Sequence, residues 1–498
     1  MTEGDGDRRA RGDRPRGQLA CLGLTEGGGG AGTPPQGIEP RPATVGDTPG
    51  EHRPTPADQP AAAATGARES APATAASDPR RWLLLAGIWA MYVAFGLVVA
   101  SLAPVLTPLG EDLGLSKSRL GAILGTWPAV FIFAAVPCGR LLDRIGLRWA
   151  LFAGGVLMGL SGMLRGLATG SVTLFVAVGI FGLGAPMISN GAPKLVVSWF
   201  GESERAKATG IYVTGPVVGQ AIALAAANSV IVPVAGGSWR SVPLVFAAVT
   251  GAVCVLWLIL TARIDSSTPQ GGPGPTGGNT ERAGVAALMS NPAMRLVLAM
   301  AVAVFFVNHG LNNWLPKIIE DGGLSAENAG YLTAAAYAAG LLGPLTLPRL
   351  GNRYPLAAPV GVSLGLGAVI AMLTLVSGLA STPFLMLIGI LRFGLAGLCL
   401  LTLMRVPGVD GRNMGIASGL FFTAGEIGGF GGPFAVGAIG DATGGFDASL
   451  WTLTAAAVLV AALFAVIHRR STRGPSRAEA AGVPDDGSTR PEPPGPVL

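Results

Sequence analysis

The feature that most constrains this chain is a series of apolar segments, each about as long as a lipid bilayer is thick. Between about residue 80 and about residue 470 the segments are rich in Ala, Leu, Val and Gly and carry few charges. A helix needs about 20 such residues to cross the hydrocarbon core. Only 13% of the chain is charged, whereas a soluble domain carries about 25%. Because the segments are continuous rather than alternating, the sequence predicts an all-α membrane protein and not a β-barrel.

Roughly twelve transmembrane helices of that length can be placed along the chain. They are expected at residues 82–107, 118–138, 149–167, 172–199, 207–234, 241–262, 296–316, 327–347, 356–379, 382–404, 413–439 and 448–467. The long polar interruption at 264–294 predicts a cytoplasmic linker between two six-helix bundles, at residues 80–263 and 295–470. Residues 1–79 and 471–498 lack apolar periodicity and predict disordered cytoplasmic tails.

The net charge of +5 and the pI near 9.3 indicate membrane topology rather than nucleic-acid binding. The basic excess lies in short loops and tails and forms no aromatic-basic patch. They concentrate on alternate loops, which predicts a multi-pass cell-membrane protein with both termini cytoplasmic. Four cysteines show neither CxxC nor CxxxC spacing, so no disulfide, metal site or cofactor is predicted.

An internal repeat supports the division into two halves. Gly114-Leu115-Ser116 recurs as Gly323-Leu324-Ser325, and Gly121 recurs as Gly330, each 209 positions later by subtraction. One constant offset is harder to obtain by chance than single glycine matches. Parallel repeats of six helices place a substrate site near the membrane midplane, between the halves.

The loop after the second predicted span carries the clearest motif. It reads Gly139-Arg140-Leu141-Leu142-Asp143-Arg144-Ile145-Gly146-Leu147-Arg148. This loop resembles the signature loop between helices two and three of the major facilitator superfamily, and a weaker copy stands at 348–353. The resemblance implies the major facilitator fold and alternating access. It also implies that five residues of the loop belong to a conformational-switch motif: Gly139, Asp143, Arg144, Gly146 and Arg148.

Further segments resemble one branch of that superfamily, the cyanate, nitrate and nitrite porters. These segments are Ala192-Pro193-Lys194, Trp199-Phe200, Glu204-Arg205, Gly425-Glu426-Ile427-Gly428-Gly429-Phe430 and Gly432-Pro433. The resemblance implies a cyanate permease-like secondary transporter of a small anion. Gly215-Pro216 and Gly219 partly match an antiporter motif, but Gln220 stands where that motif has Gly, so drug and proton exchange is the weaker interpretation.

Charged residues inside predicted spans are the main candidates for the mechanism, because a charge at the bilayer centre needs a partner or a function. Arg392 and Glu426 are expected near the midplane, where they could pair with each other. As functional groups, Arg392 would bind an anionic substrate and Glu426 would carry a proton. His309 is a second proton-coupling candidate. Arg165, near the end of its span, is expected to extend toward the membrane surface.

Polar and aromatic residues in the spans complete the candidate site. The cluster from Asn308 to Trp314 contains Gly310 and precedes Pro316, so it predicts a loosened helix that lines a cavity. The further substrate-binding candidates are Asn312, Asn313, Asn190, Lys194 and Tyr92. Trp127, Tyr212, Tyr331 and Tyr337 could also flank a substrate, although packing is the simpler interpretation of each. Three Gly pairs, 155 with 159, 361 with 365 and 428 with 432, have the small-xxx-small spacing of close helix packing.

Other classes of protein are less consistent with the sequence. No GxxxxGK[ST] loop indicates nucleotide hydrolysis, and no HExxH motif, or GxSxG motif in the expected context, indicates a membrane enzyme. A sensor that kept the fold but lost transport remains an alternative of another class. The leading prediction is proton-coupled transport of a small organic or inorganic anion by a monomer in the lipid bilayer, and drug or metabolite efflux is the alternative.

Overall fold

The computed structural model describes residues 78–262, 285–409 and 413–472 of the chain. These residues all belong to one compact unit that spans Arg68–Leu498. The predicted tails lie almost wholly outside the described residues, and so does most of the predicted linker at 264–294. Residues 285–290, at the end of that linker, are helical.

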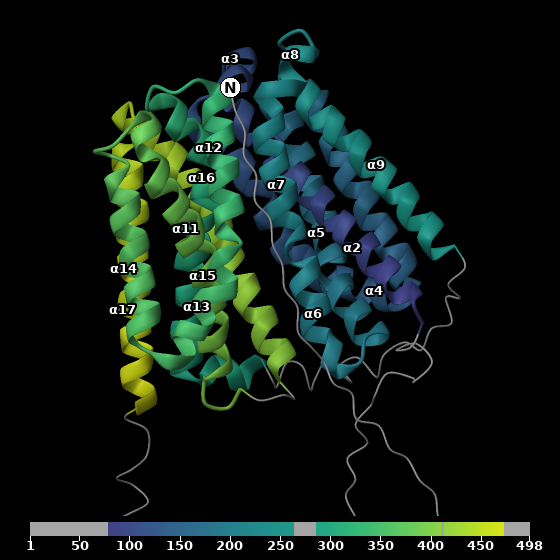
Figure 1. The fold of residues 1–498 in the computed structure, drawn as a ribbon, viewed down its shortest axis with the longest axis vertical. Coiled ribbons are helices and arrows are strands. Elements are labelled where there is room, and N and C mark those ends of the chain that lie inside the picture. The colour runs from purple at the N-terminus through teal and green to yellow at the C-terminus, as the bar shows by residue number, and fades with distance from the viewer. Residues whose placement is uncertain (1–77, 263–284, 410–412, 473–498) are drawn as a thin grey trace, which may run out of the picture. The chain divides into compact units, whose positions relative to one another are not determined.

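The described residues are helical, with no strand among them (Figure 1). The longer helices are α2 (Arg80–Ala100), α3 (Leu106–Leu113), α4 (Lys117–Gly166), α5 (Ser171–Trp199), α6 (Glu202–Tyr212), α7 (Gly215–Ala226), α9 (Ser241–Thr261), α11 (Pro292–Asp321), α12 (Ala326–Gly340), α13 (Leu342–Arg353), α14 (Ala357–Met372), α15 (Thr382–Met404), α16 (Met414–Thr443) and α17 (Asp447–Thr472). Short helical turns are η1 (Ala103–Val105), η2 (Ala227–Ile231), α8 (Val232–Val234) and η3 (Gly378–Ser381).

The predicted all-α membrane fold is confirmed. Helices cover every predicted span, and eight helical segments among the described residues are long and apolar enough to cross a membrane. One further apolar helix, Ala357–Met372, is shorter. The predicted loosening of α11 is wrong, because this helix runs without a break through Gly310. Gly310 instead leaves room for Leu453 and Val436 of neighbouring helices.

The second and third predicted spans form one continuous helical element that bends at Gly146. This residue has φ +79° and ψ 163°, inside an otherwise helical stretch. An L-residue with a side chain adopts a positive φ only at a cost, whereas glycine does so freely. Gly146 is therefore the point in the 139–148 loop at which the chain turns back across the membrane.

The repeat is visible in the local geometry of the two halves. Gly114 and Gly323 both have positive φ, at 62° and 96°. Ser116 and Ser325 then cap the helices that follow, each accepting a hydrogen bond from the N–H three residues later. Serine is favoured at this position because its hydroxyl satisfies an N–H that the first turn leaves free. Equal residues thus start α4 and α12 in the same way.

The N-terminal helices (α2 to α9) and the C-terminal helices (α11 to α17) meet mainly through α4 with α16 and α7 with α12. Repeat-equivalent glycines lie at both crossings. A Cβ atom at Gly121 would collide with the carbonyl oxygen of Pro433 on α16, and one at Gly330 would lie 2.5 Å from the carbonyl oxygen of Leu224 on α7. The absence of a side chain therefore allows backbone-to-backbone contact between the halves.

Hydrogen bonds between the halves gather at the end of the molecule that holds α3, here called the α3 end. Asp441 of α16 accepts hydrogen bonds from the backbone N–H groups of Lys117 and Ser118, at 3.0 and 2.7 Å. Thr107 donates to Glu320 at 2.9 Å. A carboxylate at a helix N-terminus satisfies free N–H groups and the helix dipole together. The α3 end is therefore closed by polar contacts above the glycine crossings.

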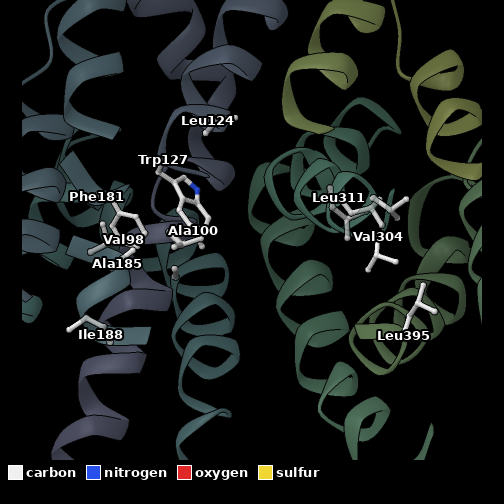
Figure 2. Close-up of a cluster of buried hydrophobic side chains, with 14 of the residues drawn as sticks. Val98, Ala100, Leu124, Trp127, Phe181, Ala185, Ile188, Val304, Leu311 and Leu395 are labelled. Atoms are coloured by element: carbon white, nitrogen blue, oxygen red, sulfur yellow. The ribbon is translucent and has the colours of Figure 1, made fainter. Parts of the chain in front are cut away.

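The apolar core extends through both halves. Figure 2 shows Val98, Trp127 and Phe181 on N-terminal helices, and Val304 and Leu395 on C-terminal helices. The expectation that Arg165 extends to the membrane surface is wrong. Its side chain is 2% exposed, and Nη1 donates to the Val98 carbonyl at 2.5 Å and to Ser101 at 3.1 Å. Because α2 ends at this point, the cation binds a carbonyl of the last helical turn and the hydroxyl of the residue that follows the helix.

The three small-xxx-small pairs differ in outcome. Gly428 and Gly432 are close-packing positions, since a Cβ atom at either would collide with a backbone carbonyl of α11. A Cβ atom at Gly155 would lie 2.5 Å from Cys254, while Gly159 and Gly365 have only ordinary contacts. The prediction is wrong for Gly361, which has nothing within 4 Å.

Candidate functional site

Arg392 lies in the middle of α15 and is buried, with 2% of its side chain exposed. Its guanidinium lies over the rings of Tyr337 and Phe393, at 4.8 and 4.5 Å from the ring centroids. Within the part of the chain that the structure describes, its Nε and Nη1 atoms have no hydrogen-bond partner. A buried cation with unused donors is suited to bind an anion, because leaving those donors without an acceptor is costly.

Glu426 of α16 faces His309 of α11. The Oε2 atom of Glu426 lies 3.8 Å from Nε2 of His309, and Glu426 is 6% exposed. Glu426 is thus paired with His309. One expectation from the sequence was that it could pair with Arg392 instead. The reason lies in Arg392, whose guanidinium is taken up by the rings of Tyr337 and Phe393. Gly429 leaves the space for the pair, since a Cβ atom there would lie 2.5 Å from Oε2 of Glu426.

His309 is also held between two aromatic rings. Trp127 of α4 stacks on it at a centroid distance of 5.3 Å, and Phe305 stacks at 5.8 Å. Trp127 comes from the N-terminal helices and His309 from the C-terminal helices, so this stack joins the two halves. Phe95 and Phe181 meet Trp127 edge to face. The result is an aromatic layer beside the Glu426 carboxylate.

Asn312 connects His309 with Arg392. It lies three residues after His309 on α11, which places both on one face of the helix. Its side-chain oxygen accepts a hydrogen bond from the Tyr337 hydroxyl, and Tyr337 in turn covers Arg392. The structure therefore brings together four of the predicted site residues and two aromatic neighbours in one cluster. We call Arg392, Tyr337, Asn312, His309, Glu426 and Trp127 the midplane cluster.

Three other predicted substrate ligands have different partners. Asn313 is 3% exposed and donates to the carbonyl of His309 within its own helix. The Tyr92 hydroxyl donates to the Ile188 carbonyl at 3.5 Å and its ring packs on Tyr212. Asn190 donates to the Ala135 carbonyl at 3.3 Å, near the start of the 139–148 loop. None of these contacts places the side chain in the midplane cluster.

Lys194, the last predicted ligand, is paired with the predicted switch motif. Its ammonium lies 2.7 Å from Asp143, and the two side chains are 26% and 61% exposed. Arg144 is exposed, and the guanidinium of Arg148 lies over Trp149. The carboxylate in this loop therefore links α5 to the bend in α4.

We expect that replacing Lys194 with Gln changes stability only slightly. An exposed ion pair contributes at most about 1 kcal/mol. A double-mutant cycle with Asp143→Asn, read from thermal unfolding of the purified protein, should give a coupling energy of that size or less. If Lys194 were instead a substrate ligand, Lys194→Gln would remove stabilisation by a bound anion while Asp143→Asn would not.

Sequence reasoning missed two members of this region. The ring centroid of Phe393 lies 4.5 Å from the Arg392 guanidinium, and Phe305 stacks on His309. Both phenylalanines lie in apolar spans that contain many similar side chains, so composition does not distinguish them. The signal that could have found Phe305 is helical spacing, since it precedes His309 by four residues.

Comparison with known proteins gives a consistent family. The model of the Major Facilitator Superfamily matches residues 88–433. A D-galactonate transporter of Escherichia coli O6:H1 is 24% identical over 76% of this chain and 94% of its own length. A quinolone resistance transporter of Acinetobacter baumannii is 24% identical over 73% of this chain and 89% of its own length.

Solved structures share the fold at low identity. A bacterial homolog of the human lysosomal transporter Spinster, in an inward-facing and occupied conformation, superposes with a TM-score of 0.65. The two chains are 19% identical, and the match covers 79% of this chain and 98% of the other. At that identity the likeness concerns the arrangement of helices.

Proposed function

Since the chain belongs to the Major Facilitator Superfamily, we propose that this membrane transporter carries a small organic anion together with a proton. Like its relatives, it is a transporter and not an enzyme. The observation that carries the proposal is Arg392, a buried cation whose Nε and Nη1 have no partner among the described residues. An intramembrane charge of this kind is a substrate site by default. A relative named for D-galactonate, an organic anion, supports the same class of cargo.

Glu426 and His309 are the groups we propose for proton coupling. Glu426 is buried and His309 is partly buried, and the Glu426 Oε2 atom has no hydrogen-bond partner among the described residues. A carboxylate in that position can exist with or without a proton, and His309 at 3.8 Å can stabilise the ionised form. Arrival of the anion at Arg392 would change the local charge and so the proton affinity of the pair.

Alternating access is proposed on the basis of the contacts at the α3 end. There Asp441 binds the first turn of α4, and Gly121 lies against Pro433. We propose that the two six-helix bundles, 80–263 and 295–470, part at this end when the other end closes. The 139–148 loop lies at the opposite end, with its basic residues, and we propose that this end and both termini face the cytoplasm.

The test is uptake by purified full-length protein in liposomes, with D-galactonate, cyanate, nitrate and benzoate as probes. We expect uptake of at least one anion to be accelerated by an inward proton gradient. Glu426→Gln should lose that acceleration, because the amide cannot take up a proton, while exchange at equal pH is slowed far less. The exposed acid Glu327, changed to Gln, is the matched control and should respond to the gradient as the wild type does.

Two outcomes would contradict these proposals separately. Equal gradient stimulation in Glu426→Gln and in the wild type would exclude Glu426 as the proton carrier. Failure to transport any of the four anions, in a preparation that folds and reconstitutes, would argue against an anionic substrate. The finer resemblance to the cyanate, nitrate and nitrite porters stays a prediction that the cyanate and nitrate probes address.

Proton-coupled efflux of a drug-like compound is the second candidate. The relative named for quinolone resistance favours it. Against it, Gln220 stands in the partial antiporter motif of α7 and binds the Pro216 carbonyl at 3.1 Å. Export of a fluorescent cation from loaded liposomes, driven by a proton gradient, would support this alternative. We further propose that the chain acts as a monomer.

A further inference from the structure

Four polar side chains on the helices that form the midplane cluster are already engaged in hydrogen bonds within their own helices. Asn308 donates to the Val304 carbonyl and Asn313 to the His309 carbonyl, both on α11. Thr126 of α4 donates to the Ala122 carbonyl, and Thr333 of α12 to the Ala329 carbonyl. These side chains satisfy their own helices, so they offer little to a ligand.

The guanidinium of Arg392 and the Oε2 atom of Glu426 are exceptions to this pattern. The ring centroids of Tyr337 and Phe393 lie 4.8 and 4.5 Å from the guanidinium of Arg392, while its Nε and Nη1 atoms lack a partner among the described residues. The Tyr337 hydroxyl donates to Asn312, which lies three residues after His309 on α11, so these side chains connect the cation to the aromatic layer. Donors in the plane of the guanidinium suit a carboxylate.

Aromatic rings make up most of the remaining cluster. Trp127, His309 and Phe305 are stacked, and Phe95, Phe131 and Phe181 meet Trp127 edge to face. Such a layer gains free energy from a flat or apolar ligand by contact area and ring stacking. It gains little from hydroxyl groups, and a hydroxyl that loses water without a new partner is penalised.

From a buried cation with two unused donors and an aromatic layer with few free polar groups, we infer that the substrate is a carboxylate on an aromatic or apolar body. A polyhydroxylated sugar acid fits the cluster poorly. The inference rests on the proposed function and narrows it, with Arg392 binding the carboxylate and Trp127 contacting the body of the ligand.

The experiment is equilibrium binding to purified full-length protein in detergent, measured by calorimetry with benzoate, propionate and D-galactonate. Benzoate and propionate share the carboxylate, whereas only benzoate has a ring. We expect benzoate to bind at least about tenfold more tightly than either of the others, since ring contacts of this kind are worth about one factor of ten.

Trp127→Leu separates ring contact from folding. We expect it to weaken benzoate binding about tenfold and to leave propionate binding unchanged. Trp451→Leu, at an exposed position of α17, is the matched control and should change neither. Because propionate binding reports an intact Arg392 site, a variant that merely misfolds would lose both ligands and be recognised.

The outcomes distinguish this inference from the proposed function. If D-galactonate binds as tightly as benzoate, or Trp127→Leu leaves the ratio of benzoate to propionate unchanged, the inference is wrong while anion transport stands. If none of the three anions binds, and none is transported, both proposals are overturned. Tighter benzoate binding that depends on Trp127 supports the inference.

Discussion

Replacing Arg392 with Gln is expected to reduce anion binding and uptake by about thirtyfold or more. Removing one partner of a buried, hydrogen-bonded charge pair costs about 2 to 5 kcal/mol, and each 1.4 kcal/mol is a factor of ten. The loss is large here because Arg392 is 2% exposed, so water cannot replace the guanidinium. Uptake of labelled anion into liposomes, and calorimetric binding, are the measurements.

Two further variants make this result specific to the cation. Arg392→Lys keeps the charge but loses the planar donors and ring contacts, so we expect an intermediate loss. Arg295→Gln, at an exposed position of α11, should bind and transport as the wild type does. Full uptake by Arg392→Gln would exclude this arginine as the anion ligand.

Replacing Gly121 with Val is expected to prevent the α3 end from closing. The new Cβ atom would overlap the carbonyl oxygen of Pro433, and because that oxygen is backbone, no rotamer relieves the overlap. Overpacking of this kind costs about 1 to 3 kcal/mol, or about 5- to 150-fold in the balance between closed and open forms. Transport should slow accordingly.

The opening can be measured with a cysteine at Leu124, which is 4% exposed beside the crossing. In a background with Cys21 changed to Ser, we expect Gly121→Val to raise its reaction rate with a membrane-impermeant maleimide about tenfold. Gly251→Val on α9 is the matched control, since nothing lies within 4 Å of a Cβ atom there. An unchanged reaction rate would mean that the helices absorb the overlap without separating.

Much of the fold follows from the sequence because the bilayer dictates the length of each apolar segment. The spans, the turn at Gly146 and the repeated starts of α4 and α12 are local features, so a local pattern reveals them. The partners of Arg165, in contrast, cannot be predicted from the local sequence. Its partners, Val98 and Ser101, lie on α2, and only the packed structure brings a helix end to a cation more than sixty residues away.

The candidate site was predictable in its charges and not in its pairings. Arg392, Glu426 and His309 stand out because charged or titratable residues are rare in spans. Their partners depend on helix rotation, which hydropathy does not specify. The rotation of α15 turns Arg392 toward α12, where it contacts Tyr337. Glu426 is then paired with His309. The same uncertainty explains why Lys194 meets Asp143 instead of the cluster.

The equivalent positions of Gly121 and Gly330 in the repeat have a consequence for how the α3 end behaves. The two crossings, α4 with α16 and α12 with α7, are two seams at equivalent positions of the repeat. If the halves separate as rigid bodies, both seams must be released in one concerted step. A bulky residue in either seam should therefore hold the whole α3 end open, although the two glycines share no neighbour.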